Sequence, residues 1–167
     1  MKILLTCSSR HGATDSVAEV IAERLREADL VVDLAKPEDV TDVSDYDAFI
    51  LGSAVYMTHW TPEAVDFTTR FRQELKGHPV WAFSVGLSGL LQGEISDPHR
   101  IGPVLLAIDP EDHKTFAGRF DPAQLSLRER TIARMGGASE GDYRDFDAVR
   151  QWADEIVTSL KAGEGKA

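Results

Sequence analysis

Three short, nearly continuous apolar runs constrain the fold of this chain more than any other feature: residues 3–5, 48–51 and 80–85. Strands with one face in water alternate apolar and polar side chains, whereas strands that are covered on both faces are apolar throughout. The three runs are therefore predicted to be buried strands of a parallel sheet that has helices packed on both of its faces.

The other periodic segments extend this pattern. Residues 30–34 and 113–118 predict two further strands. An amphipathic pattern predicts helices over residues 15–28 and 145–160, and the Thr61-Pro62 helix start predicts one over residues 61–75. Shorter helices are expected over residues 104–108 and 125–135. Strand and helix thus alternate along the chain, which predicts a doubly wound α/β sandwich of three layers.

Length and charge narrow the classes of function. The 167 residues match one ordinary domain, expected over residues 1–162, with residues 163–167 as a disordered tail. The formal net charge of −10 argues against nucleic acid as a partner, because phosphates are bound through clustered Lys and Arg. No apolar stretch reaches the roughly 20 residues of a membrane-spanning helix, which leaves only peripheral membrane contact open.

Cys7 is the single cysteine of the chain, so no internal disulfide is expected. No charged and then apolar leader precedes the first predicted strand, and a reducing cytoplasm is the simplest compartment for such a chain. Because Cys7 has no second thiol near it, we interpret it as a buried structural thiol. The histidines lack metal-ligand spacing, and we expect no metal site.

The segment after the first predicted strand is the most informative candidate site. Ligands of an open parallel sheet bind at the carboxyl ends of its strands, and hydroxyl groups, a glycine and a helix start can hold a phosphate there. The segment has neither Gly-x-Gly-x-x-Gly nor Gly-Lys-Ser/Thr, which excludes a dinucleotide fingerprint and a Walker loop. The phosphate-binding candidates are Ser8, Ser9, Arg10, His11, Gly12, Ala13 and Thr14.

The run Ser9-Arg10-His11-Gly12-Ala13-Thr14 resembles the phosphate loop of the flavodoxins, Thr/Ser-x-Thr-Gly-x-Thr, with His11 in place of the middle Thr. Three further stretches are similar to the flavodoxin branch that contains the menaquinone-dependent protoporphyrinogen dehydrogenases: residues 50–55, residues 83–87 and Met135-Gly136-Gly137. The resemblance implies a flavodoxin-like α/β fold, a three-layer sandwich with a five-stranded parallel sheet of order 2-1-3-4-5. It also implies flavin mononucleotide (FMN) as the cofactor.

In this family the flavin ring stands between the second and third loops. Carried over by position, one wall would be Ala54, Val55, Tyr56 and Met57, and the other Val85, Gly86, Leu87 and Ser88. Such apolar or aromatic walls suit a flavin ring. His59, a few residues after the second stretch, is a candidate to donate a proton or a hydrogen bond to the reduced flavin or to a substrate.

The combined observations predict an FMN-binding redox protein that passes electrons between a donor and an acceptor, such as a quinone or a partner protein. Three alternatives stay open: a protoporphyrinogen IX dehydrogenase, a protein that holds a deazaflavin, and a flavodoxin fold without enzymatic function. The stretch between Gly86 and Lys114 is acidic and has no aromatic residue, a poor match for a flat porphyrinogen. A signalling receiver domain is disfavoured, because Gly52 and Ser53 stand where it needs an aspartate.

Overall fold

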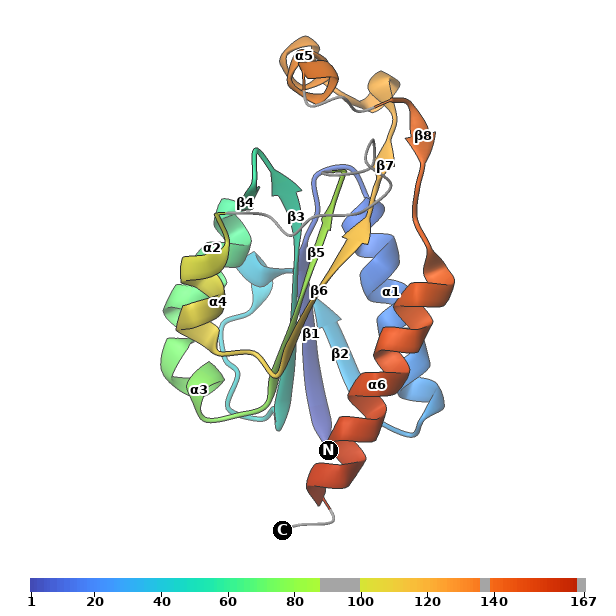
Figure 1. Ribbon diagram of the computed structural model, residues 1–167. Helices are drawn as coiled ribbons and strands as arrows, with labels where there is room; N and C mark the ends of the chain where they lie inside the picture. Colours follow the sequence, from blue (N-terminus) through green and yellow to red (C-terminus); the bar gives the residue numbers. More distant parts are fainter. Residues whose placement is uncertain (88–99, 136–138, 165–167) are drawn as a thin grey trace.

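A parallel sheet occupies the centre of the protein, in a computed structural model that describes residues 1–87, 100–135 and 139–164 (Figure 1). Its strands are β1 (Lys2–Ser8), β2 (Val31–Ala35), β3 (Ala48–Tyr56), β5 (Val80–Gly86) and β6 (Asp112–Ala117). They follow the order β2-β1-β3-β5-β6, and each neighbouring pair is parallel. Numbered among themselves, these strands have the order 2-1-3-4-5, which confirms the predicted fold class.

Helices cover both faces of the sheet (Figure 1). One face carries α1 (Ala13–Glu27) and α6 (Phe146–Glu164), which pack against each other. The other face carries α2 (Pro62–Arg70), α3 (Arg72–Lys76) and α4 (Gly102–Ile108), with the 3-10 turn η1 (Pro37–Asp39) beside α2. The central strands are therefore shielded on both sides, which is why their sequences are apolar and not alternating.

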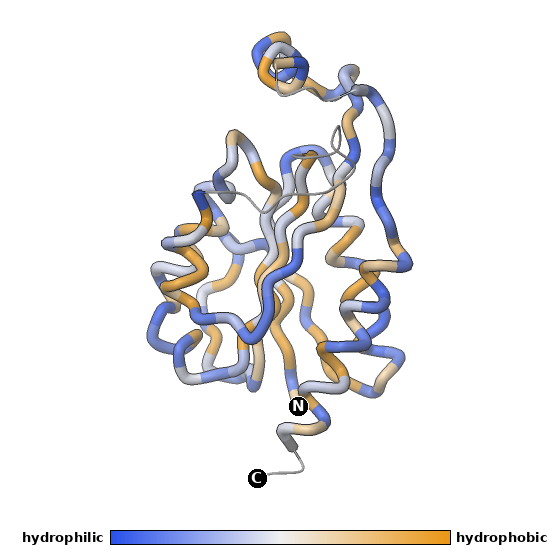
Figure 2. Tube along the Cα trace, viewed as in Figure 1, coloured by the Kyte–Doolittle hydropathy of each residue, from blue (hydrophilic) through white to orange (hydrophobic). Residues whose placement is uncertain are grey.

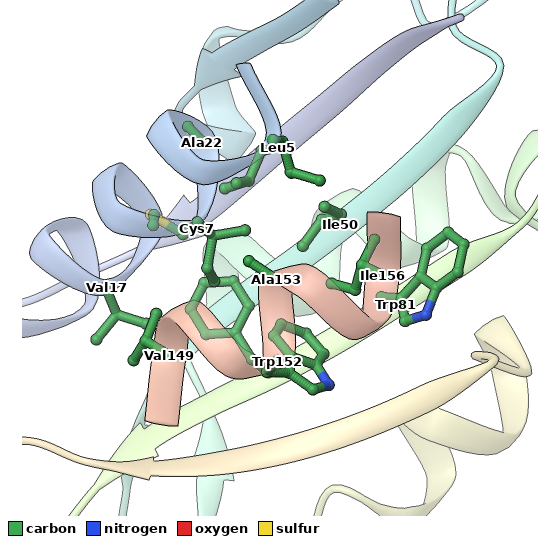
Figure 3. Close-up of a cluster of buried hydrophobic side chains, with 14 of the residues drawn as sticks. Leu5, Cys7, Val17, Ala22, Ile50, Trp81, Val149, Trp152, Ala153 and Ile156 are labelled. Carbon is green, nitrogen blue, oxygen red and sulfur yellow. The ribbon is translucent and has the colours of Figure 1, made fainter. Parts of the chain in front are cut away.

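Two groups of buried side chains fill the space between the sheet and its helices. Figure 3 shows Val17 of α1 beside Val149 of α6, and Ile156 of α6 beside Ile50 of the sheet, all within one buried cluster. Figure 2 shows the same arrangement as hydrophobic segments along the central strands and polar positions toward the outside of the helices. The apolar residues of the three predicted runs are thus buried, as expected for a core that burial of apolar surface stabilises.

The central strands extend further than their apolar runs indicate. β1 continues to Ser8 and β3 continues to Tyr56, so Ser8 ends a strand and Ala54 to Tyr56 form the last residues of another. Polar side chains are tolerated there because the structure gives them partners. The buried Ser53 hydroxyl accepts a hydrogen bond from the backbone N–H of Thr61 at 2.9 Å.

The helix predicted over residues 61–75 forms as two helices. The side chain of Thr61 caps α2 by accepting a hydrogen bond from the backbone N–H of Ala64, and Pro62 occupies the first turn, as predicted. α2 ends at Arg70, and α3 begins after Phe71. At the end of the chain, α6 continues through residue 164. The predicted tail was therefore wrong for residues 163–164, and residues 165–167 lie outside the described part.

Short strands that the sequence did not predict extend from the carboxyl end of the sheet (Figure 1). β4 (His59–Trp60) pairs with the end of β3 as an antiparallel hairpin, and β7 (Arg119–Phe120) pairs with β8 (Gly141–Asp142) as a two-stranded ribbon. Between β7 and β8 the chain forms the 3-10 turn η3 (Pro122–Gln124) and α5 (Leu127–Met135). These elements lie at the end of the sheet where the predicted site is.

Candidate functional site

A cavity of about 340 Å³ opens at the carboxyl ends of β1, β3 and β5. Its walls come from the turn between β1 and α1, from the β3–β4 hairpin, from the end of β5, and from the β7–α5 segment. This is the edge at which open parallel sheets bind ligands. The volume falls in the range of pockets that take a small molecule or a cofactor.

The turn that joins β1 to α1 forms one end of the cavity. Gly12 has a φ of +81°, a left-handed conformation that favours glycine, and it stands directly before α1. Its backbone N–H donates to Oγ of Ser9 at 3.0 Å, which fixes the turn. The first N–H groups of a helix have no partner within the helix, so Ala13 and Thr14 bring free donors and the positive end of the helix dipole to this turn.

The β3–β4 hairpin forms one side wall. Met57 and Thr58 have φ values of +49° and +67°, as in a type I′ turn, although neither is a glycine. Trp60 holds the hairpin against the sheet, because its buried indole N–H donates to Oγ of Ser84 on β5 at 2.8 Å. Tyr56 faces the cavity with the guanidinium of Arg10 4.9 Å from its ring centroid, a cation–π distance.

The end of β5 and the start of the ribbon form the opposite wall, and two glycines allow them to approach closely. A Cβ on Gly86 would lie 3.3 Å from Cβ of Val55, and one on Gly118 would lie 3.3 Å from Cγ1 of Val85. The backbone N–H of Gly118 donates to the carbonyl of Gly86 at 2.9 Å. Small residues at both positions therefore keep this side of the cavity narrow and apolar.

α5 forms the remaining wall, and its first turn is a capping box. Oγ of Ser126 accepts from the backbone N–H of Glu129, and Glu129 accepts in return from the backbone N–H of Ser126. The same carboxylate lies 3.3 Å from Nε2 of His11 in the β1–α1 turn. The Ser126 hydrogen bonds, followed by His11, lower the pKa of Glu129, so the carboxylate that links α5 to the turn is ionised near neutral pH.

An arginine at the base of the ribbon fixes the other end of the α5 segment. Arg144 binds both carboxylate oxygens of Asp142, at 2.8 and 2.6 Å, and also donates to Oγ of Ser16 on α1 at 2.9 Å. Hydrogen bonds from Arg144 lower the pKa of Asp142 to about 2. Arg144 thus attaches the base of the ribbon to α1 through Ser16, and its ion pair with Asp142 keeps both charges until the solution is strongly acidic.

Most of the predicted cofactor-binding positions line this one cavity. They are Ser9, Arg10, His11, Ala13, Thr14, Ala54, Val55, Tyr56, Met57, Val85, Gly86 and Leu87. Ser8 and Gly12 support the turn but do not line the cavity, and Ser88 lies outside the described residues. His59 stands on β4, exposed and away from the cavity lining, with Nδ1 2.9 Å from the carbonyl of Met57. A role in proton donation stays a prediction for His59.

The structure also places residues at the cavity that the sequence did not predict: Thr58, Gly118, Arg119, Phe120, Leu125, Glu129, Ile132 and Ala133. The helix expected over residues 125–135 forms as α5, and the Ser126-x-x-Glu129 spacing is a visible capping box. Neither signal indicates where the helix packs. Its position depends on the ribbon, which no local pattern predicted.

Cys7 lies near the cavity but does not line it. The side chain is 4% exposed, and burial, followed by the charge of Asp15, raises the pKa of the thiol far above its usual range. We expect Ellman's reagent at about pH 8 to react about 100-fold more slowly with the folded protein than with the protein in denaturant. Equal rates in the two conditions would contradict a buried Cys7.

The strand order 2-1-3-4-5, a turn with hydroxyl groups at the start of α1 and an apolar cavity between the strand ends together characterise a flavodoxin-like protein. A family model described as "Flavodoxin domain" matches residues 4–147, and the chain belongs to this family. Membership indicates FMN as the cofactor. The residues present fit FMN, because helix amides and hydroxyl groups lie at one end of the cavity and Tyr56, Val85 and Leu87 provide apolar walls at the other.

Solved structures share the fold of this chain. Rubredoxin:oxygen oxidoreductase from Desulfovibrio gigas superposes with a TM-score of 0.65 at 16% identity, over 96% of this chain and 36% of that one. A flavodoxin from the domain Archaea gives 0.63 at 15% identity, and a cysteine-to-serine mutant of a flavodoxin from Pseudomonas aeruginosa gives 0.59 at 14%. Both matches cover 96% of this chain and 99% of the flavodoxin.

The search of curated proteins found no match. Within the described residues, no helix is both long and apolar enough to cross a membrane.

Proposed function

We propose that this protein holds FMN in the cavity and transfers electrons between a reducing partner and an acceptor such as a quinone, in the cytoplasm. FMN, when bound, supplies the redox chemistry, because its ring accepts and releases electrons. The observation that carries the proposal is the shared cavity of three separate segments at the strand ends, each of which the family resemblance had assigned to the cofactor.

Different residues of the chain would bind the phosphate at one end of the cavity and the flavin ring at the other. Ser9, Thr14 and the first amides of α1 would bind the phosphate, since hydroxyl and amide donors at a helix start suit an anion without needing a cation. Tyr56, Val85 and Leu87 would bind the flavin ring and exclude water from it. Such binding positions the ring and sets its surroundings, which tune its redox potential.

α5 supports an acceptor that is small and apolar. Ile132 and Ala133 on α5, with Leu125 just before it, add apolar surface to the cavity. A quinone ring suits such a surface, because apolar pockets with a few polar groups bind flat apolar ligands. The acidic composition between residues 86 and 114 remains an argument against porphyrinogen, and an anaerobic turnover screen with quinones, protoporphyrinogen and reduced nicotinamide would separate these substrates.

Binding of FMN is the first test. We expect titration of the flavin-free protein into FMN to quench flavin fluorescence with one site per chain. Thr14→Val keeps the shape of this buried side chain and removes its hydroxyl. We expect it to weaken binding about tenfold or more, because a hydrogen bond to a charged group contributes roughly 1.5–3 kcal/mol.

Thr158→Val is the matched control, because Thr158 is an exposed helical threonine on α6 whose hydroxyl donates to the backbone carbonyl of Asp154 in its own helix. Its affinity for FMN should equal that of the parent protein. The proposal is overturned if the folded parent protein fails to bind FMN. If Thr14→Val, Thr158→Val and the parent bind FMN with equal affinity, the Thr14 hydroxyl does not bind the phosphate.

A further inference from the structure

α5 presents one set of side chains to the cavity and a different set to the solvent. Glu129, Ile132 and Ala133 line the cavity. The exposed residues fall on the opposite side of the helix at 3.6 residues per turn, and they are Leu127, Arg128, Thr131, Arg134 and Met135. Leu127 is 80% exposed and Met135 is 84% exposed. The outer side of α5 therefore combines large apolar side chains with cations.

The charge of α5 is opposite to that of the chain as a whole. The helix contains three arginines and one carboxylate, in a chain with a formal net charge of −10. The carboxylate, Glu129, is bound to Ser126 and His11 on the inner side. Arg128 and Arg134 have no ion-pair partner among residues 1–87, 100–135 and 139–164. The outer side of α5 thus carries positive charge that nothing described in the protein neutralises.

The same kind of surface continues around the cavity. Met57, at the tip of the β3–β4 hairpin, lines the cavity and is 59% exposed. Arg10 and Arg119 line the cavity from the β1–α1 turn and from β7. Cations and exposed apolar side chains therefore surround the place where the cofactor is proposed to bind.

We propose that the outer side of α5, the "α5 surface" formed by Leu127, Arg128, Arg134 and Met135, docks a protein partner with an acidic surface. Arginine and methionine are enriched at protein interfaces, where the apolar stems pack and the guanidinium groups pair with carboxylates. The inference rests on the proposed redox function, because a partner at this site lies next to the FMN cavity. The inference adds that the docking surface of this partner is negatively charged.

A membrane surface fits the α5 surface less well. α5 has nine residues and offers only two large apolar side chains, whereas interfacial helices insert a broad apolar face. A protein partner needs only local charge complementarity, since charges more than about 10 Å away are screened at moderate salt.

The test uses the ¹⁵N-labelled full chain loaded with FMN and zinc-substituted rubredoxin as a small, acidic, diamagnetic probe. We expect chemical-shift changes on addition of the probe to concentrate at residues 127–135 and at the hairpin tip. They should disappear at about 500 mM NaCl, where charges are screened within a few ångström. Arg128→Gln with Arg134→Gln should weaken binding about tenfold.

The double variant Arg72→Gln with Arg150→Gln is the control, because both arginines are exposed and lie on α3 and α6, far from α5 (Figure 1). It loses the same charge and should bind the probe like the parent. Basic cytochrome c should not shift residues 127–135. The inference is overturned if the probe shifts other residues, if cytochrome c binds α5, or if both double variants weaken binding equally.

Two further outcomes would identify a different occupant and overturn the inference. Shifts at α5 that grow with protein concentration alone would indicate a second copy of this chain. Binding of anionic phosphatidylserine vesicles through α5 would indicate a membrane surface. The FMN titration tests separately whether the chain binds FMN, on which the proposed redox function depends. A chain that binds FMN but shows no shift at α5 contradicts the docking surface alone.

Discussion

Replacing Gly52 by alanine is expected to lower the free energy of unfolding by about 3 kcal/mol, and replacing it by valine is expected to prevent folding. Gly52 lies on β3 between Cys7 of β1 and Phe83 of β5. A Cβ there would lie 2.1 Å from Cζ of Phe83, a distance that non-bonded carbon atoms cannot adopt. The ring is fully buried and has little room to move. Urea denaturation followed by circular dichroism measures the loss.

A double-mutant cycle separates this steric effect from a general cost of substitution. We expect Gly52→Ala to cost about 1 kcal/mol or less in a Phe83→Leu background, because the smaller side chain leaves space for the added methyl group. Gly102→Ala is the control, since a Cβ on Gly102 meets nothing within 4 Å. An unchanged denaturation midpoint for Gly52→Ala would show that Phe83 does not cover Gly52.

Replacing Trp152 by alanine is expected to lower the free energy of unfolding by about 3–5 kcal/mol, the range for a large aromatic side chain removed from a core. Trp152 is 2% exposed and joins α6 to the sheet. Its ring lies edge-on to Phe83 and Phe116, with centroids 6.1 and 5.7 Å away. Thermal and urea denaturation followed by far-ultraviolet circular dichroism measure the loss without relying on tryptophan fluorescence.

Two further substitutions divide the contribution of Trp152 between packing and its hydrogen bond. The indole N–H donates to Oδ2 of Asp112 at 2.7 Å, and Asp112 is exposed. Asp112→Asn should therefore cost only about 1 kcal/mol, and Trp152→Phe should cost less than Trp152→Ala. The neighbouring exposed Gln151 provides the control, with an expected change within about 0.5 kcal/mol for Gln151→Ala. A loss for Asp112→Asn as large as for Trp152→Ala would contradict a packing role.

Much of the lining of the candidate site could be predicted because its parts are local. Gly12 precedes a helix directly after a strand, and this order by itself places hydroxyl groups and amides at a helix start. The ends of the buried runs near residues 54–57 and 85–87 follow from the same rule for parallel sheets. The position of His59 could not be predicted in this way. His59 lies on a hairpin that turns it away from the cavity, and that hairpin is held by the contact of Trp60 with the distant Ser84.

The sequence by itself determined the class of sheet, since strands buried on both faces must be apolar throughout, and it determined the position of the β1–α1 turn at the strand ends. Only the tertiary structure placed α5 over the strand ends and Phe83 over Gly52. The His11–Glu129 contact joins residues 118 positions apart. Patterns within a few residues report local burial and backbone conformation. They carry no information on which distant segments pack together, because that depends on the free energy of the whole folded chain.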